Sequence, residues 1–203
     1  MGRDLLSDSG LSVSLIEDRL LQEICDSDSP RGILAVASLP PTPLASVPLV
    51  DRGVYVYVDG MQDPGNLGAL ARIVEAFGAI ALILGPATVH PNHPRALRAS
   101  AGSLLRVSVA SDVSATDLTA HLGPISPSWA VMTPRNGVSL DELSSLGTLI
   151  MTIGAEGPGV SSRVLEQADI LVSIPLAGDV ESLNSTVAAS IALYQLSRSR
   201  SLS

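Results

Sequence analysis

Apolar and polar positions alternate along most of this chain in a pattern that predicts strands and helices in turn. From residue 54 onward, short aliphatic runs are separated by stretches whose apolar residues recur every three or four positions. The predicted strands cover residues 54–58, 80–84, 106–110, 129–133, 148–153 and 170–174. The predicted helices cover residues 66–77, 94–101, 114–121, 161–167 and 182–196. Strands that alternate with helices at this spacing pair in parallel, so we expect an α/β fold, a mostly parallel sheet with helices on both faces.

The first 48 residues do not follow this alternation. Apolar residues between Leu11 and Ile24 drift into helical spacing, and residues 32–37 predict a short strand. A proline-rich link follows at residues 39–48, and its four prolines fit neither a central strand nor a helix. We therefore predict two parts, residues 1–48 and a main domain at residues 49–203.

The amino-acid composition indicates which side chains fill the core and which classes of protein are excluded. Hydrophobic residues make up 46% of the chain but aromatic residues only 2%, so the core must consist mainly of Leu, Val, Ile and Ala. Aliphatic strands covered by small-residue helices fit this composition. No apolar run approaches the roughly 20 residues that cross a bilayer, and Asp4 and Asp8 interrupt the region where a signal peptide would be apolar. We expect a cytoplasmic protein without a membrane partner.

Cysteine content and charge limit the other partners. Cys25 is the only cysteine, and no ligand pairs stand at metal-binding spacing, so we expect neither a disulfide nor a metal site. The net charge of −8 disfavours RNA, because phosphate binding draws on a basic surface. All twelve basic residues are arginines, however, and Arg95, Arg98 and Arg106 fall close together. They are either a local basic patch or ordinary solvated side chains.

The first chemically informative segment runs from Asp59 to Arg72 and reads DGMQDPGNLGALAR. It follows an aliphatic strand and opens a helix, with Asn66 suited to the N-cap and Gly78 to the position after the helix. The apolar stripe of this helix consists of Leu67, Leu70, Val74 and Phe77. Arg72 points well away from the stripe, so it either faces a cleft or is an ordinary surface arginine. The pattern G-x-G-x-x-G of dinucleotide-binding loops is absent.

A second segment, Ile153 to Gly159, reads IGAEGPG and follows the apolar strand at residues 148–153. Glycines at a strand end let the backbone approach a ligand closely, and the carboxylate of Glu156 can accept a hydrogen bond from an amine or hydroxyl. The segment is either a ligand loop or a glycine-rich turn with a solvated Glu156.

The third segment, Ser173 to Val187, reads SIPLAGDVESLNSTV. A strand ends at Pro175, a loop follows, and we predict a helix from Ser182. The apolar positions of this helix are Leu183, Val187, Ile191 and Tyr194. The polar side chains of its first turn are Ser182, Asn184 and Thr186. N-capping by Ser182 explains one of these polar groups, whereas a site at the open end of the sheet explains all three.

Taken together, the segments resemble the SpoU/TrmH family of knotted SPOUT methyltransferases. The family's three motifs stand here in order as DPGNLGALAR, GAEGPG and IPLAGDVESLN, and the intervening RALRASAGSLLRV is also similar. The resemblance covers about residues 54–196, with one departure: the usual Leu-Asn-Val-Ser is Leu-Asn-Ser-Thr at residues 183–186. Residues 24–36 resemble only the end of an RNA-binding domain like ribosomal protein L30e, so residues 1–48 look like a remnant of such a domain plus the linker.

The resemblance implies a deep C-terminal trefoil knot that cradles S-adenosyl-L-methionine. The implied cofactor-binding residues are Thr133, Gly154, Ile174 and Leu183. The implied catalytic residues are Arg72, Asn66, Glu156, Ser182 and Asn184. In such families these side chains converge on the reacting centre, and a homodimer brings residues of two chains together.

The implied activity is methylation of a ribose 2′-hydroxyl in rRNA or tRNA, with no DNA partner. A guanidinium has a pKa above about 12 and is a poor base, so Arg72 either abstracts the hydroxyl proton or orients the hydroxyl or a phosphate. A second hypothesis is a catalytically inactive knotted module that binds RNA or a protein. A nucleotide-dependent oxidoreductase would need the phosphate fingerprint that the sequence lacks.

Overall fold

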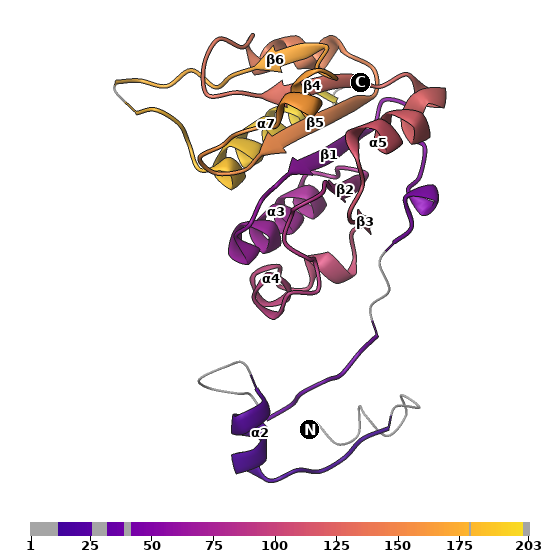
Figure 1. Ribbon diagram of the computed structural model, residues 1–203, viewed down its shortest axis with the longest axis vertical. Helices are drawn as coiled ribbons and strands as arrows, with labels where there is room; N and C mark the ends of the chain where they lie inside the picture. Colours follow the sequence, from indigo (N-terminus) through magenta and orange to yellow (C-terminus); the bar gives the residue numbers. More distant parts are fainter. Residues whose placement is uncertain (1–11, 26–31, 39–41, 179, 201–203) are drawn as a thin grey trace. The chain divides into compact units, whose positions relative to one another are not determined.

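The computed structural model describes residues 12–25, 32–38, 42–178 and 180–200 (Figure 1). The chain divides into two units, residues 1–39 and residues 40–203, so the boundary falls at the beginning of the proline-rich link. Leu11, at the start of the predicted N-terminal helical stretch, and Pro40 and Pro41 of the link lie outside the described residues.

The N-terminal unit contains helix α2, Asp18–Ile24, which is shorter than the helical stretch predicted from Leu11. The predicted strand at residues 32–37 is wrong, because residues 32–38 form no strand. Ile33 and Val36 are 71% and 97% exposed. An apolar run becomes a strand only where a neighbouring strand pairs with its backbone N–H and C=O groups, and no described residue pairs with this one.

The second unit is built on one six-stranded sheet with the order β3-β2-β1-β5-β4-β6. Every pair of neighbouring strands is parallel, which confirms the predicted parallel sheet. The strands are β1 Val54–Asp59, β2 Ala81–Leu84, β3 Val109–Ala110, β4 Ser128–Met132, β5 Leu149–Gly154 and β6 Ile170–Val172. Strand β3 is shorter than the predicted 106–110, because the backbone N–H groups of Arg106 and Val107 donate to the Ser103 carbonyl in a turn. Strands β1 and β5, which pair from Val54 with Leu149 to Asp59 with Gly154, lie at the centre of the sheet (Figure 1).

The helices follow the predicted order with shifted ends. They are α3 Pro64–Ala76, α4 Pro94–Ala99, α5 Ala115–Leu122, α6 Ser162–Leu165 and α7 Ser185–Arg200. Helix α3 begins two residues earlier than predicted, because Asp63 and not Asn66 is its N-cap: the Asp63 carboxylate accepts a hydrogen bond from the Asn66 backbone N–H at 2.8 Å. Gly78 follows the helix with φ +69°, as predicted for the residue after a C-cap.

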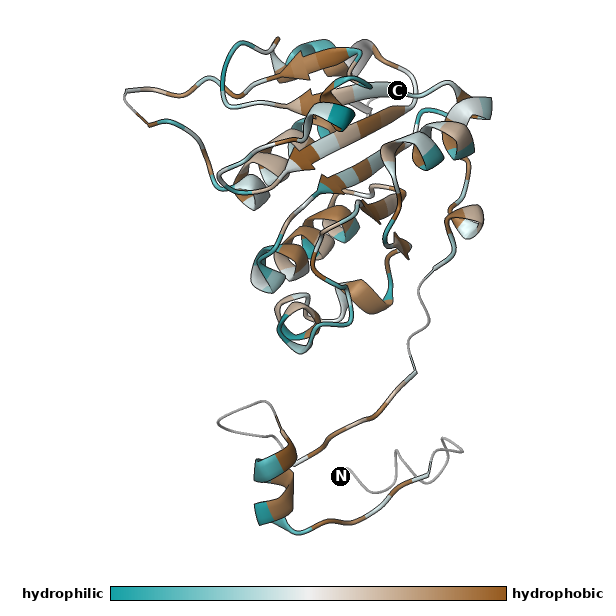
Figure 2. Ribbon diagram, viewed as in Figure 1, coloured by the Kyte–Doolittle hydropathy of each residue, from teal (hydrophilic) through white to brown (hydrophobic). Residues whose placement is uncertain are grey.

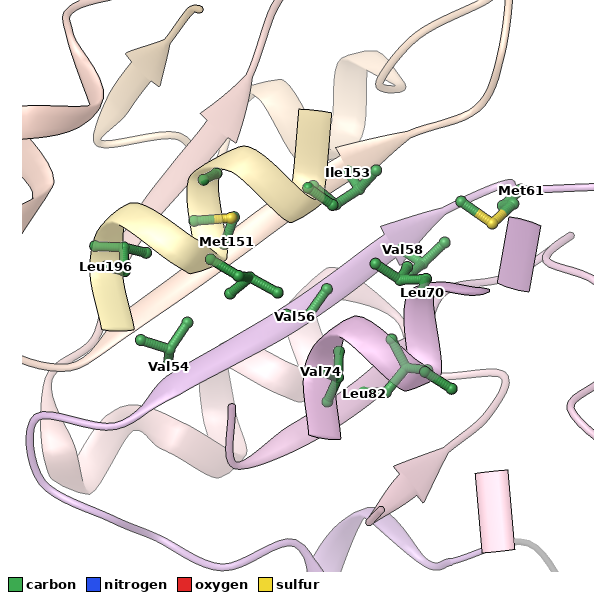
Figure 3. Packing of buried hydrophobic residues seen from close by; sticks show 14 of the residues in the cluster. Val54, Val56, Val58, Met61, Leu70, Val74, Leu82, Met151, Ile153 and Leu196 are labelled. Carbon is green, nitrogen blue, oxygen red and sulfur yellow. The ribbon is translucent and has the colours of Figure 1, made fainter. Parts of the chain in front are cut away.

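Two apolar clusters cover the two faces of the sheet, which confirms helices on both sides. Figure 3 shows one of them, in which Val54, Val56 and Val58 of β1 lie between α3 and α7. On the opposite face Tyr55 and Tyr57 pack with residues of α5 and α6. Alternate residues of β1 thus point to opposite faces, and both faces are buried. Figure 2 shows that hydrophobic residues concentrate in the strands.

Helix α7 buries a face that the sequence did not predict. Its buried hydrophobic residues are Ala189, Ala192, Leu193 and Leu196. The predicted apolar positions Val187, Ile191 and Tyr194 are instead exposed at 48%, 39% and 48%. The small alanines let α7 approach the sheet and α3 closely, so they occupy the inner face and leave the larger side chains outside.

The Arg106 guanidinium is paired with the Glu75 carboxylate, so the predicted grouping of Arg95, Arg98 and Arg106 does not present three unpaired charges.

No helix within the described ranges is long and apolar enough to cross a membrane. The same ranges contain no group of three or more His, Cys, Asp or Glu side chains arranged to hold a metal ion.

Candidate active site

A cavity of about 510 Å³ lies where β4, β5 and β6 end. Its wall comes from the segment after β4, the glycine-rich loop after β5, and the connection from β6 to the first turn of α7. Ligands of parallel sheets bind at the carboxyl ends of the strands, because the loops there can be varied without disturbing the core. The second and third segments singled out in the sequence therefore meet at one site.

The glycine-rich loop is held tightly at its base. The backbones of Ala155 and Gly159 exchange two hydrogen bonds of 3.1 and 3.0 Å, which closes the loop around Glu156. A Cβ on Gly154 would lie 2.5 Å from the Gly159 backbone, so only glycine permits this approach. Gly157 and Gly159 have φ +86° and +74°, a conformation that glycine adopts without strain. The glycines thus shape the loop and bring its backbone to the cavity.

Asp59 anchors the end of this loop. The residue is buried at the end of β1, and its carboxylate accepts a hydrogen bond from the Ser161 backbone N–H at 2.6 Å. This contact joins the first motif segment to the chain that leaves the second. It fixes the position of the loop relative to the start of α3.

Three polar side chains from the three motif segments meet beside the cavity. The Asn66 side-chain amide donates to Glu156 Oε1 at 2.7 Å, and the Asn184 side-chain amide donates to the same oxygen at 2.5 Å. Asn184 Nδ2 also lies 3.5 Å from Asn66 Oδ1. Because Asp63 caps α3, the Asn66 side chain is available for this contact. Asn66, Glu156 and Asn184 are hereafter the polar triad.

Helix α7 begins later than predicted, and this changes the role of Asn184. The helix starts at Ser185, and Asn184 Oδ1 accepts hydrogen bonds from the backbone N–H groups of Thr186 and Val187 at 3.0 and 3.2 Å. Asn184 is therefore the N-cap, and the alternative of capping by Ser182 is wrong. Ser182 is exposed and lines the cavity. Asn184 uses its oxygen for the helix and its nitrogen for Glu156.

The remaining predicted site residues lie in two different places. Those predicted to bind the cofactor all line the cavity: Thr133, Gly154, Ile174 and Leu183. Arg72 does not line it. Its exposed side chain lines a shallow groove of about 360 Å³ between α3 and α7, together with Phe77 and Ser190.

Two polar side chains of the cavity wall were not among the predicted site residues. Ser185 has a buried hydroxyl with no hydrogen-bond partner in the described structure, and Glu181 adds a second carboxylate to the wall that Glu156 also lines. Glu181 lies within the third motif, IPLAGDVESLN, and Ser185 directly follows it. Both could therefore have been found by considering every polar residue of that motif and its neighbour. No cationic side chain is among the described residues that line this wall.

The chain is similar to a known protein family and to individual known proteins. The model of the SpoU rRNA methylase family matches residues 53–194. The 23S rRNA (guanosine(2553)-2'-O)-methyltransferase RlmP of Bacillus subtilis is 28% identical over 192 residues, which cover 93% of this chain and 74% of that protein. An uncharacterised tRNA/rRNA methyltransferase of Mycobacterium sp. (strain KMS) is 38% identical over 154 residues, or 72% of this chain and 47% of that protein. The chain thus spans about half the length of the mycobacterial relative.

The chain is also similar in fold to a solved structure that contains AdoMet. The SpoU methyltransferase AviRb from Streptomyces viridochromogenes, in complex with AdoMet, superposes with a TM-score of 0.76 at 26% identity. The match covers 81% of this chain and 67% of that chain.

Proposed function

Since this chain belongs to the SpoU rRNA methylase family, we propose that it is an RNA methyltransferase that uses S-adenosyl-L-methionine to methylate a ribose 2′-hydroxyl in rRNA or tRNA. The observation that carries the proposal is the polar triad, in which one side chain from each of three distant segments meets at the edge of one cavity. The relatives named above supply the reaction type and the class of RNA.

The cavity fits S-adenosyl-L-methionine in size and chemistry. Its volume of about 510 Å³ lies within the range of small-molecule sites, roughly 300–1,000 Å³. The unpartnered hydroxyl of Ser185 offers a hydrogen bond to a polar ligand. Thr133, Gly154, Ile174 and Leu183 would hold the cofactor by backbone and apolar contacts. When bound, the cofactor supplies an electrophilic methyl group on a sulfonium.

The chain's own residues would place the attacking hydroxyl. Asn66 and Asn184 fix the Glu156 carboxylate, and Ser182 lines the same cavity. Holding the two reactants at attack distance accounts for much of the acceleration of such a transfer. Arg72 would orient the hydroxyl or a neighbouring phosphate, or take up the hydroxyl proton.

We further propose that the protein acts as a homodimer in which Arg72 serves the site of the second chain. The exposed apolar residues of α7 are Val187, Ile191 and Tyr194, hereafter the α7 stripe. They recur at intervals of four and three residues, so they lie on one side of the helix. Tyr194 stacks edge-on against Phe77, whose side chain lines the groove that also holds Arg72. A second chain on the α7 stripe would cover this groove.

We also propose that the C-terminal segment forms the family's trefoil knot. The chain after β4 lies tightly against the end of β6: Val138 N donates to Leu171 O at 2.8 Å, and Ser173 N donates to Val138 O at 3.0 Å. A Cβ on Gly137 would collide with the backbone of Val172 and Ser173. This close approach supports a crossing of the two segments. We propose RNA binding for the N-terminal unit as well, because residues 24–36 resemble part of an RNA-binding domain like ribosomal protein L30e.

The test of the proposed activity begins with calorimetry on the full chain. S-adenosyl-L-methionine should bind with a Kd in the micromolar range, about −8 kcal/mol, and NAD should not bind. Labelled cofactor with rRNA and tRNA should then transfer its methyl group to a ribose, located by mass mapping. Binding of NAD without a response to S-adenosyl-L-methionine would overturn the proposal.

A further inference from the structure

The charged side chains that line the cavity wall are acidic. Glu156 and Glu181 both line it, whereas the described lining residues include no Arg, Lys or His. The two carboxylates come from different segments, the loop after β5 and the connection to α7. A cavity lined by one sign of charge favours ligands of the opposite sign.

The two carboxylates differ in their surroundings. Glu156 Oε1 accepts two amide hydrogen bonds and belongs to the polar triad. Glu181 is exposed, and no described residue is bonded to its carboxylate. The charge of Glu181 is therefore not used to hold the protein together and is available to a ligand. The unpartnered, buried hydroxyl of Ser185 in the same wall independently points to a polar ligand there.

We propose that Glu181 is a specificity-determining residue that selects the cationic form of the cofactor over the neutral product; this inference rests on the proposed function. In the transfer, the bond from the methyl carbon to sulfur breaks and a bond from that carbon to the ribose oxygen forms. Sulfur keeps the electron pair and loses its positive charge, and the hydroxyl proton leaves. The attraction to Glu181 is present before the transfer and absent after it, so the residue favours binding of S-adenosyl-L-methionine and release of S-adenosylhomocysteine.

The experiment compares three ligands by calorimetry on the full chain. They are S-adenosyl-L-methionine, S-adenosylhomocysteine, and sinefungin, which carries an ammonium-bearing carbon in place of the sulfonium. Glu181→Gln removes the charge at constant size. Glu166→Gln is the matched control, because Glu166 is an exposed carboxylate outside the cavity wall. Each titration is repeated at low and high salt, since salt screens exposed charges.

The wild type should bind the two cationic ligands at least about tenfold more tightly than S-adenosylhomocysteine. Glu181→Gln should weaken both cationic ligands by about three- to tenfold, leave the neutral product within about twofold, and lose the salt dependence. Glu166→Gln should match the wild type. Equal weakening of all three ligands, or no change in any, would overturn the role of Glu181 and leave the methyltransferase proposal intact. If the wild type bound none of the three, the proposed function itself would fail.

Discussion

Arg72 is an exposed residue of α3, so its side chain should contribute to chemistry more than to folding. Arg72→Ala is expected to lower methyl transfer to RNA by about a hundredfold or more, the range for a positioned proton-transfer or charge-stabilising group. The affinity for S-adenosyl-L-methionine and the melting temperature should change little, because Arg72 lines the groove and not the cavity. Labelled-cofactor assays and calorimetry on the same variant measure both effects.

Leu70→Ala is the contrasting control for that experiment. Leu70 is fully buried on the same helix, so its truncation leaves a cavity and should cost roughly 2 to 5 kcal/mol of unfolding free energy. An Arg72→Ala protein that methylates RNA at the wild-type rate would remove Arg72 from the mechanism. A wild-type protein that binds cofactor but is inactive on every RNA would favour the inactive-module hypothesis.

Glu75 gives a stability prediction with a defined pH window. Hydrogen bonds from the Arg106 guanidinium and then from the Ser103 hydroxyl lower the pKa of Glu75 from 4.5 to about 2. A carboxylate with a lowered folded-state pKa stabilises the protein above its unfolded-state pKa, and this stabilisation is lost as pH falls. The stability difference between the wild type and Glu75→Gln should therefore be full at pH 6 and should shrink between pH 4.5 and about 2.

Urea unfolding at several pH values measures this difference. Glu166→Gln serves again as the control and should follow the wild type throughout. The same difference between wild type and Glu75→Gln at pH 6 and at pH 2.5 would show that the ionised Glu75 is not the stabilising form.

At the scale of elements, Asn184 caps the start of α7 and is also a residue that we propose to act in methyl transfer. Asn184→Ala removes the cap and the contact with Glu156, so it should cost about 0.5–2 kcal/mol of stability as well as activity. Asn184→Asp keeps an oxygen for the cap but replaces the amide donor by a second carboxylate next to Glu156. This variant should retain most of the stability while losing methyl transfer.

Thermal unfolding and methylation assays on the two variants separate the roles. Loss of stability in Asn184→Asp as large as in Asn184→Ala would mean that the contact with Glu156, and not the cap, holds this end of the helix.

The sequence predicted correctly those elements that the local pattern of residues determines. Strands β1 and β5 are continuous aliphatic or tyrosine-rich runs, and their positions were predicted within one residue. The exposed run at residues 32–37 has a similar apolar pattern, yet it forms no strand because pairing depends on distant residues. The inner face of α7 was predicted wrongly for a related reason: Ala189 and Ala192 are weak signals in a sequence, and only close packing makes them the buried side.

At the scale of the whole molecule, the site could be predicted only as a set of motifs. The family resemblance implied that Asn66, Glu156 and Asn184 would meet. Their spacing in the chain does not indicate that both amides donate to the same oxygen of Glu156. The strand order that places β5 between β1 and β4 is likewise a long-range property. Caps could have been predicted locally, since Asp63 precedes Pro64 in a pattern typical of helix starts.

The proposed homodimer can be tested by its interface. Ile191 lies in the middle of the α7 stripe, so Ile191→Glu would place a charge on a surface that needs to be apolar. The wild type should have the mass of a dimer by light scattering at micromolar concentration, and Ile191→Glu that of a folded monomer. Leu105→Glu is the control, because Leu105 is also an exposed apolar residue but lies outside the stripe. A monomeric wild type would contradict the dimer.

A mixing experiment tests whether the dimer shares its sites between chains. If Arg72 of one chain serves the polar triad of the other, Arg72→Ala and Asn184→Ala homodimers each contain two defective sites. A mixed dimer then contains one intact site, formed by the unchanged Arg72 and the unchanged Asn184. Random exchange makes half of the dimers mixed, so activity should recover to about a quarter of the wild-type value. If both residues act within one chain, every site in the mixture remains defective and activity does not recover.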